Sequence, residues 1–158
     1  MSSVRALLLF LLSGFLGSYA ADSRSVSVIG TNEHLSNGAQ ALLMGNHHEG
    51  VRLTRKGLSM ATSRAHRSTA LNNLCAGLVG IEEFDEAIEI CDEALTVNDK
   101  NWRIYNNRAL AYLGKGDVEK AKRDVEAGLA LSPESVKLAR VQAMITARDV
   151  QPTVTISN

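Results

Sequence analysis

Aromatic residues and unbalanced charge are both scarce in this sequence. Phe, Trp and Tyr make up 4% of the 158 residues, and 17 basic residues match 17 acidic ones. Proteins that bind nucleic acid usually carry an excess of basic residues, often with aromatic side chains that stack on bases. The composition therefore argues against a nucleic-acid partner.

Motifs that carry catalytic chemistry are also missing. The sequence contains no Gly-rich phosphate loop, no H-E-x-x-H, no C-x-x-C and no nucleophile elbow. His47 and His48 do not suit a metal site, because neighbours in a helix point about 100° apart and chelation on one face needs a separation of three or four residues. We therefore predict a protein that is not an enzyme and that uses no metal or cofactor.

A long apolar run occurs only near the start of the chain, over residues 6–16, directly after the basic Arg5. The run is shorter than the roughly 20 residues that cross a bilayer, and small residues lead up to a cleavage junction after Ala20. The pattern predicts a signal peptide over residues 1–20. We expect a periplasmic or secreted protein, cleaved near Ala20, with no direct membrane insertion.

Cysteine is represented by Cys75 and Cys91 alone. An exported protein meets oxidising conditions, and an even number of cysteines permits pairing. A disulfide needs Cα atoms within about 7 Å of each other, so the sequence is compatible with one bond or with two buried thiols.

A repeat of 34 residues runs through the middle of the chain. The doublet Asn72-Asn73 in "ALNNLCAGLVG" recurs as Asn106-Asn107 in "IYNNRALAYLGKGD", and 107 − 73 = 34. Apolar and small residues recur at spacings of three and four in each unit, which predicts helical hairpins. Further residues match at the same offset: Leu71 with Tyr105, Leu78 with Tyr112, Ala87 with Ala121, and Leu95 with Leu129.

These features resemble the tetratricopeptide repeat family, whose period is about 34 residues. Units are assigned to residues 31–64, 68–101 and 102–135, with three extra residues, Ala65–Arg67, after the first. The resemblance implies an all-α fold, a right-handed superhelical solenoid of three helix-turn-helix hairpins. The last unit matches the family at Tyr105, Ala109, Tyr112, Gly116, Asp117, Ala121, Leu129 and Pro133.

The segments that flank the repeats differ in character. Residues 136–149 carry apolar residues on one face and predict a capping helix, which repeat arrays need at their ends. Ser132 is expected at a helix cap, with Pro133 in the first turn. Residues 21–30 and 150–158 are short, polar and β-branched, and we predict flexible ends, with a small strand pair as the alternative.

In the family's architecture, the first helices of successive repeats line a concave peptide-binding groove. Leu35, Leu42 and Leu110 are expected to act there as apolar anchors. An Asn amide both donates and accepts, so it can pair with the backbone of an extended peptide of any sequence. The resemblance places in the groove Leu35, Ala39, Leu42, Asn72, Asn73, Ala76, Arg103, Asn106, Asn107 and Leu110.

The two members of each doublet are not equivalent. We favour the groove role for Asn72 and Asn106. For Asn73 and Asn107, a structural role in which they bond the end of the preceding helix fits equally well.

A subgroup of the family binds acidic chaperone tails through a clamp of Lys, Arg and Asn. Asn73 and Arg103 match that clamp, but Leu35 and Ala39 stand where Lys and Asn are wanted, and Asn107 replaces a basic residue. We therefore expect an exported scaffold or adaptor that binds an extended or helical segment of another protein. The alternative is a structural or assembly component that self-associates through an outer repeat face.

Overall fold

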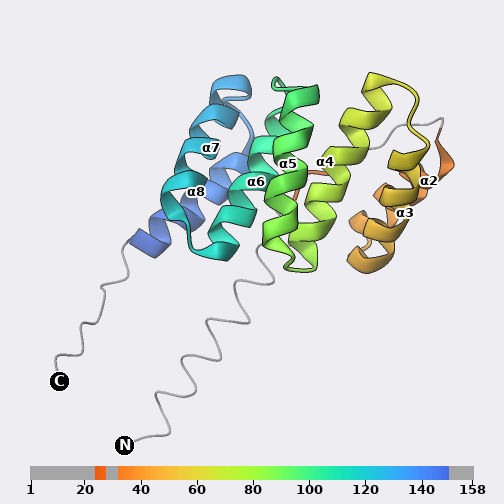
Figure 1. Cartoon of the computed structure of the whole chain (residues 1–158). Coiled ribbons are helices and arrows are strands. Elements are labelled where there is room, and N and C mark those ends of the chain that lie inside the picture. The colour runs from red at the N-terminus through yellow and green to blue at the C-terminus, as the bar shows by residue number, and fades with distance from the viewer. Residues whose placement is uncertain (1–23, 28–31, 150–158) are drawn as a thin grey trace, which may run out of the picture.

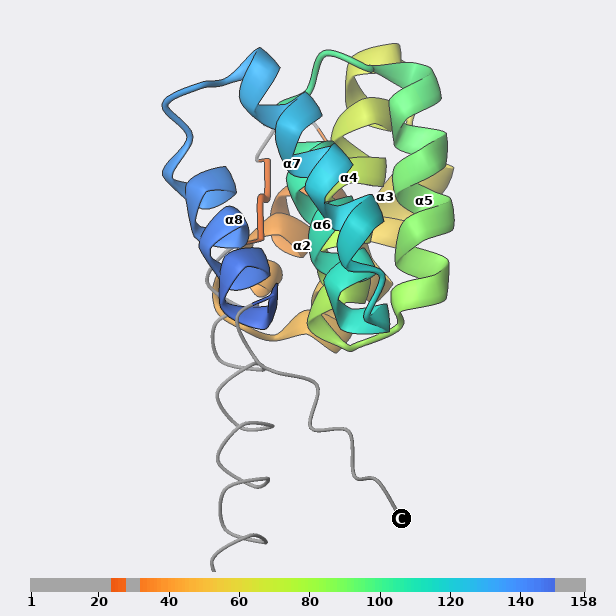
Figure 2. The same cartoon turned by 90° about the vertical axis from the view of Figure 1, so that its left-hand side faces the viewer.

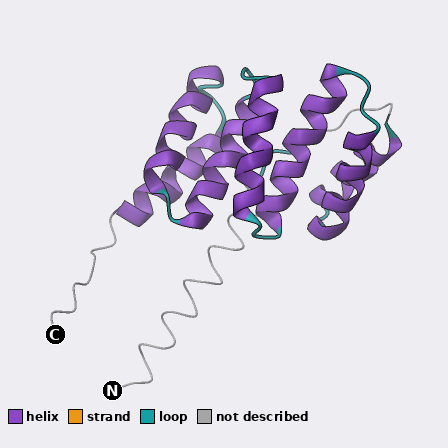
Figure 3. Cartoon of the chain, in the orientation of Figure 1, coloured by secondary structure: helices purple, strands orange, loops and turns teal. Residues whose placement is uncertain are grey.

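The computed structural model describes residues 24–27 and 32–149, and these residues contain seven helices and no strand (Figure 1 and Figure 3). The predicted signal peptide over residues 1–20 and the predicted tail over residues 150–158 lie outside the described residues. The helices are α2 (Glu33–Leu43), α3 (His47–Ser59), α4 (Arg64–Gly80), α5 (Phe84–Val97), α6 (Trp102–Lys115), α7 (Val118–Leu131) and α8 (Val136–Asp149).

Consecutive helices pair into the hairpins α2–α3, α4–α5 and α6–α7, and α8 packs on the last hairpin against α6 and α7. The hairpins stand side by side along the molecule (Figure 1). This arrangement confirms the predicted all-α solenoid, and α8 covers the range predicted for the capping helix.

Each hairpin closes on small residues of its second helix. Gly50, Ala87 and Ala121 occupy equivalent, buried positions on α3, α5 and α7. A Cβ atom at Gly50 would lie 2.4 Å from the Leu42 side chain, and one at Gly57 would lie 2.5 Å from Leu35. Larger residues at these positions would therefore push the two helices apart.

Two helix starts differ from the sequence-based expectation. Residues 65–67 are not a spacer between units but belong to the first turn of α4, because Ser63 caps that helix by accepting a hydrogen bond from the His66 N–H. Ser132 ends α7 and does not begin α8. The N–H of Leu138 instead donates to the Ser135 hydroxyl at 3.4 Å, so Ser135 caps α8.

The corner inside each hairpin needs a residue with left-handed backbone. Gly45, Glu82 and Gly116 occupy this position with φ angles of 80°, 64° and 82°. Asp117 follows Gly116 and accepts from the Lys120 N–H at 3.2 Å, so α6 ends at this corner and Asp117 caps α7. The middle hairpin is unusual because it places a side chain where its neighbours have glycine.

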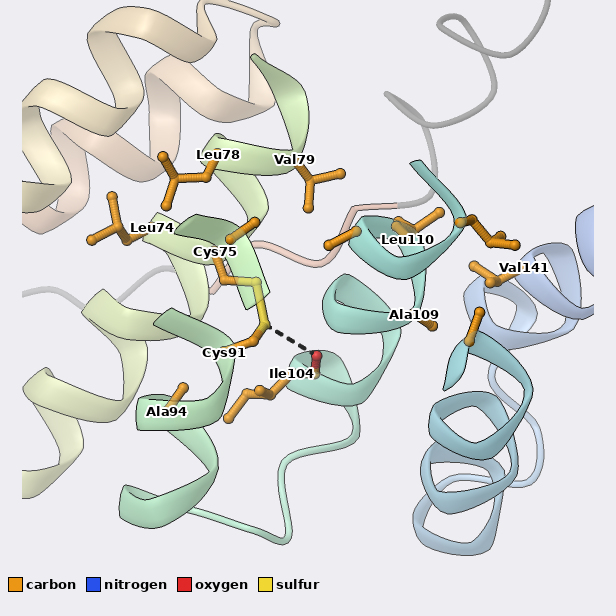
Figure 4. Close-up of a cluster of buried hydrophobic side chains, with 14 of the residues drawn as sticks. Leu74, Cys75, Leu78, Val79, Cys91, Ala94, Ile104, Ala109, Leu110 and Val141 are labelled. Carbon is orange, nitrogen blue, oxygen red and sulfur yellow. Dashed lines mark hydrogen bonds between the residues drawn. A yellow bond between two sulfur atoms is a disulfide. The ribbon is translucent and has the colours of Figure 1, made fainter. Parts of the chain in front are cut away.

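A disulfide joins the two helices of the middle hairpin. Cys75 on α4 and Cys91 on α5 are fully buried, and their Cα atoms are 5.6 Å apart (Figure 4). Gly38 and Thr54 occupy the equivalent positions of the first hairpin. They are also close together there, because a Cβ atom at Gly38 would lie 2.6 Å from the Thr54 hydroxyl. The sulfur of Cys91 also lies 3.4 Å from the carbonyl oxygen of Ile104, which brings the bond against α6.

Arg108 of α6 connects the second and third hairpins. Its guanidinium donates to both carboxylate oxygens of Asp124 on α7, at 2.8 and 2.6 Å, and to Asp92 on α5 at 2.5 Å. Burial raises the pKa of Asp124, and the Arg108 guanidinium opposes that rise. The bidentate pair therefore fixes the orientation of α6 between its neighbours.

The strained corner at Glu82 generates a first prediction. A non-glycine residue in the left-handed region costs about 1–2 kcal/mol. Glycine removes this cost, but part of the gain is offset because glycine loses more conformational entropy on folding. We expect Glu82→Gly to raise the free energy of unfolding by about 1 kcal/mol in urea denaturation. Gly116→Ala, at the equivalent corner, is the matched control and should lower it by a similar amount. A lower midpoint for Glu82→Gly would contradict the corner geometry.

The disulfide generates a second prediction. A bond that closes a loop of about 15 residues stabilises a domain by roughly 3 kcal/mol through its effect on the unfolded chain. The double variant Cys75→Ala with Cys91→Val copies the equivalent residues of the third hairpin, Ala109 and Val125. We expect it to unfold at lower urea concentration than the oxidised protein and close to the reduced one. Equal stability of oxidised and reduced wild type would count against the bond.

Candidate peptide-binding groove

The two Asn doublets are buried in the middle of the helical array. Asn72 and Asn73 lie on α4, Asn106 and Asn107 lie on α6, and all four side chains have an exposed fraction of 0%. A buried amide that makes no hydrogen bond costs about 1–3 kcal/mol. The groups that pair with these amides therefore decide what this face of the molecule does.

An extended segment of the chain itself lies on the Asn doublets. Residues 24–27 run past α8, α6 and α4, on the side away from α5 (Figure 2). Arg24 and Ser25 are buried there. This position differs from the flexible end predicted over residues 21–30, because the segment finds hydrogen-bond partners more than 40 residues away in the sequence.

Two Asn side chains pair with the segment's backbone in the manner of a neighbouring β-strand. Asn107 Oδ1 accepts from the Ser25 N–H at 2.8 Å, and Asn107 Nδ2 donates to the Ser25 carbonyl at 3.0 Å. Asn73 does the same at Ser27, accepting from its N–H at 2.6 Å and donating to its carbonyl. Alternate residues of an extended chain face the same way, so one side of the segment satisfies both amides.

Further bonds tie the amides to one another. Asn72 Nδ2 donates to the Ser25 carbonyl at 2.9 Å, and Asn72 Oδ1 accepts from Asn107 Nδ2 at 3.2 Å. Asn106 Nδ2 donates to Asn107 Oδ1 at 3.4 Å. These hydrogen bonds between amides fix the orientation in which each amide meets a bound peptide.

The structure shows which groups Asn73 and Asn107 bond, a point that the sequence left open. Asn73 and Asn107, for which a structural role seemed equally suitable, make the paired contacts to the segment. Asn72 contributes one bond to the segment's backbone, whereas the bond described for Asn106 goes to its neighbour Asn107. In each doublet the first Asn also donates a hydrogen bond to Oδ1 of the second, at 3.1 Å from Asn72 and 3.4 Å from Asn106.

The start of the segment is held by two residues that the sequence analysis did not place in the groove. Lys137 of α8 donates to the Arg24 carbonyl, and the Arg24 guanidinium lies 2.6 Å from Nε2 of His47. Burial lowers the pKa of His47, and the positive charge of Arg24 and, to a smaller extent, that of His48 lower it further. The low pKa favours the neutral ring, which can accept this hydrogen bond. In the sequence, Lys137 belongs to the predicted capping helix, and His47 was considered only as a metal ligand. Neither residue was therefore predicted to contact a peptide.

The predicted apolar anchors are not available to a partner. Leu35 and Leu42 pack inside the first hairpin against Gly57 and Gly50, and Ala39 is fully buried. This prediction was wrong because the glycines of α3 let the leucines sink between the two helices. Ala76 and Leu110 are also core residues; Leu110 belongs to the cluster that includes Val141 of α8 (Figure 4).

Arg103 lies at the margin of the groove. Its guanidinium stacks on the ring of Trp102, 4.6 Å from the ring centre. Both residues line a shallow pocket beside Ser25 and Val26 that continues to Lys137. The pocket adjoins the segment at Ser25 and Val26, and none of the four Asn side chains of the doublets lines it.

Other kinds of site find little support in the described part of the chain. Residues 24–27 and 32–149 hold no group of three His, Cys, Asp or Glu side chains placed to bind a metal ion. None of the helices described here combines the length and the apolar character that crossing a bilayer requires.

Comparisons with known proteins agree with the repeat. A family model for the tetratricopeptide repeat matches residues 103–135. Sperm-associated antigen 1 of Mus musculus is 40% identical over 67 residues, and the protein of Rattus norvegicus is 40% identical over 60 residues. These matches cover 42% and 38% of this chain but only 7% of each relative.

Solved structures share the fold at low sequence identity. The first repeat domain of Spaghetti (RPAP3), bound to the HSP90 peptide SRMEEVD, has a TM-score of 0.67 at 19% identity and covers 80% of this chain and 100% of that one. The second repeat domain of human RPAP3, in complex with the HSP70 peptide SGPTIEEVD, has a TM-score of 0.63 at 18% identity, with coverage of 72% and 92%. The Sgt2 domain from Aspergillus fumigatus scores 0.66 at 19% identity, with coverage of 85% and 93%.

The 34-residue spacing, the stacked helical hairpins with their small packing residues, and the match over residues 103–135 lead to one assignment. Residues 103–135 match the tetratricopeptide repeat, and the described residues have the fold of tetratricopeptide repeat domains.

Proposed function

We propose that this protein is a non-enzymatic interaction module whose Asn groove holds an extended segment of a partner protein. The observation that supports it is the two-bond pairing of Asn107 and Asn73 with the backbone of Ser25 and Ser27. A site that satisfies both the N–H and the carbonyl of alternate residues suits an extended peptide and suits little else. Complexes of RPAP3 domains with chaperone peptides show that this fold can hold such a segment.

The partner is recognised through its backbone rather than through an acidic end. The peptides in the two RPAP3 complexes both end in Glu-Glu-Val-Asp. In this chain, Asn107 stands where the family's clamp would have a basic residue, and its amide is committed to a peptide group. Asn amides carry no charge to offset that of an acidic end, and Leu35 and Asn107 stand where the clamp would have basic residues, so we do not propose an acidic chaperone tail as the partner.

The proposed setting is an exported one, outside the reducing cytosol. The Cys75–Cys91 bond supports it, because disulfides persist mainly in oxidising compartments. The basic residue and apolar run at the start of the sequence support it independently.

The groove generates a third prediction. Peptides selected from a random dodecapeptide display library on the full chain should bind the variant Asn73→Ala with Asn107→Ala at least tenfold more weakly. Each substitution removes two hydrogen bonds to the peptide backbone, worth about 1 kcal/mol each, and tenfold corresponds to about 1.4 kcal/mol. The measurement is fluorescence polarisation, at a temperature where circular dichroism shows both proteins folded.

The matched control for this experiment is Asn37→Ala. Asn37 also lies inside a helix, but its side chain is exposed. It should leave affinity unchanged and raise the melting temperature slightly, because Ala is the better helix former. Selected peptides that bind the double variant as well as wild type would mean that partners dock on another surface.

The exported setting generates a fourth prediction. Mass spectrometry of the intact protein recovered from the cells that make it should give the mass of a chain that begins near Ala21. That mass should be lower by two hydrogens because of the disulfide. Reduction should add the two hydrogens back. A mass that begins at the initiator methionine, with both thiols free, would reject export.

A further inference from the structure

The segment over residues 24–27 has the features of a ligand. Ser25 and Ser27 present their backbone to Asn107 and Asn73, while the intervening Val26 is only partly buried beside Trp102. Its contacts come from α4, α6 and α8 and from the start of α3, so it crosses the array and does not extend any helix. The described contacts use the backbone of Arg24, Ser25 and Ser27, together with the Arg24 guanidinium and the Ser27 hydroxyl.

The position of Ser25 admits only a small residue. Its exposed fraction is 1%, and Asn72 and Asn107 both contact its backbone. Its hydroxyl oxygen is buried, so a larger side chain at this point would have to displace neighbouring groups. Ser27 is less enclosed, and its hydroxyl lies 3.4 Å from Asn72 Nδ2.

The position of Arg24 is formed for a long basic side chain. The guanidinium reaches His47, and Lys137 binds the carbonyl of the same residue. A Cβ atom at Gly80 would lie 2.7 Å from the His47 ring and 3.0 Å from the Arg24 guanidinium. The glycine at the end of α4 therefore leaves the room that this contact needs.

We propose that residues 24–27 are a ligand of the groove in cis, and that a partner displaces them with an extended segment of the same pattern: Arg, a small residue, any residue, a small residue. The proposal rests on the proposed function, because it concerns the same site. The proposal specifies the class of peptide that binds, and it identifies residues 24–27 as the segment that competes with the partner for the groove.

Competition in cis follows from the tether. A segment joined to its site by a short linker experiences an effective concentration in the millimolar range. A partner's apparent affinity then falls by the fraction of molecules whose groove is open. A segment that binds in trans with a dissociation constant of about 0.1 mM would therefore weaken a partner roughly tenfold.

The test removes the segment from the groove without shortening the chain. Ser25→Pro with Ser27→Pro deletes the two N–H groups that donate to Asn107 and Asn73, and proline keeps an extended backbone. Val26→Pro is the matched control, because the Val26 N–H takes no part in the pairing with the amides. The probe is a fluorescein-labelled peptide with the sequence of residues 22–29, DSRSVSVI, and the readout is fluorescence polarisation.

We expect the probe to bind the Ser25→Pro, Ser27→Pro variant at least tenfold more tightly than wild type or Val26→Pro. Adding Asn73→Ala and Asn107→Ala to that variant should abolish the gain. Among altered probes, a Leu in place of Ser25 or a Glu in place of Arg24 should bind at least tenfold more weakly. A Leu in place of Val26 should bind as the original does.

Amide hydrogen exchange on the wild-type chain gives a second measurement that depends on no variant. The N–H groups of Ser25 and Ser27 should exchange slowly, and that of Val26 should exchange fast. Equal exchange at all three would overturn the proposal.

The binding experiment separates this proposal from the proposed function. Equal binding of the probe to wild type and to the Ser25→Pro, Ser27→Pro variant would overturn competition in cis, and so would a probe that binds neither. In both cases, library peptides that lose affinity with Asn73→Ala and Asn107→Ala would still support a peptide-binding groove. If those peptides also failed to respond, the proposed function itself would fall.

Discussion

The pairing of buried Asn amides with a peptide backbone is the interaction on which this structure depends. Each amide carries a donor and an acceptor, and the pairs on α4 and α6 have lost all contact with water. Removing the segment would either leave these groups unpaired, at about 1–3 kcal/mol each, or admit water between the helices. The free energy is therefore lower when an extended segment fills the groove than when the amides are left unpaired. This holds whether the segment comes from the same chain or from a partner.

The repeat supplies the spacing that an extended chain needs. Packed helices lie about 8–10 Å apart, and two residues of an extended chain span roughly 7 Å. Side chains that converge on the inner face can close the difference, so Asn73 and Asn107 meet Ser27 and Ser25 in order. The first hairpin has Leu35 and Ser36 at the equivalent positions, and Leu35 packs on Gly57 instead. The buried Asn side chains thus lie on the second and third repeats.

Much of the fold could be predicted from the sequence because its signals are local and periodic. The spacing of three and four defined the hairpins, and the amide chemistry of the doublets indicated an extended backbone as their partner. The occupant could not be predicted, since the polar and β-branched character of residues 21–30 gives no indication of partners that lie 46 and 82 residues away. Leu35 and Leu42 were misassigned because their burial depends on glycines of the facing helix, which a groove pattern does not register.

The same chemistry makes the segment replaceable. It has no large apolar side chain in a pocket, and its attachment rests on the eight described hydrogen bonds, each worth roughly 0.5–1.5 kcal/mol net. Ordering four residues costs about 1–2 kcal/mol per residue, which nearly cancels that gain. A segment held so close to balance stays in the groove because it is tethered there. A partner with a similar backbone and one additional side-chain contact can therefore displace it.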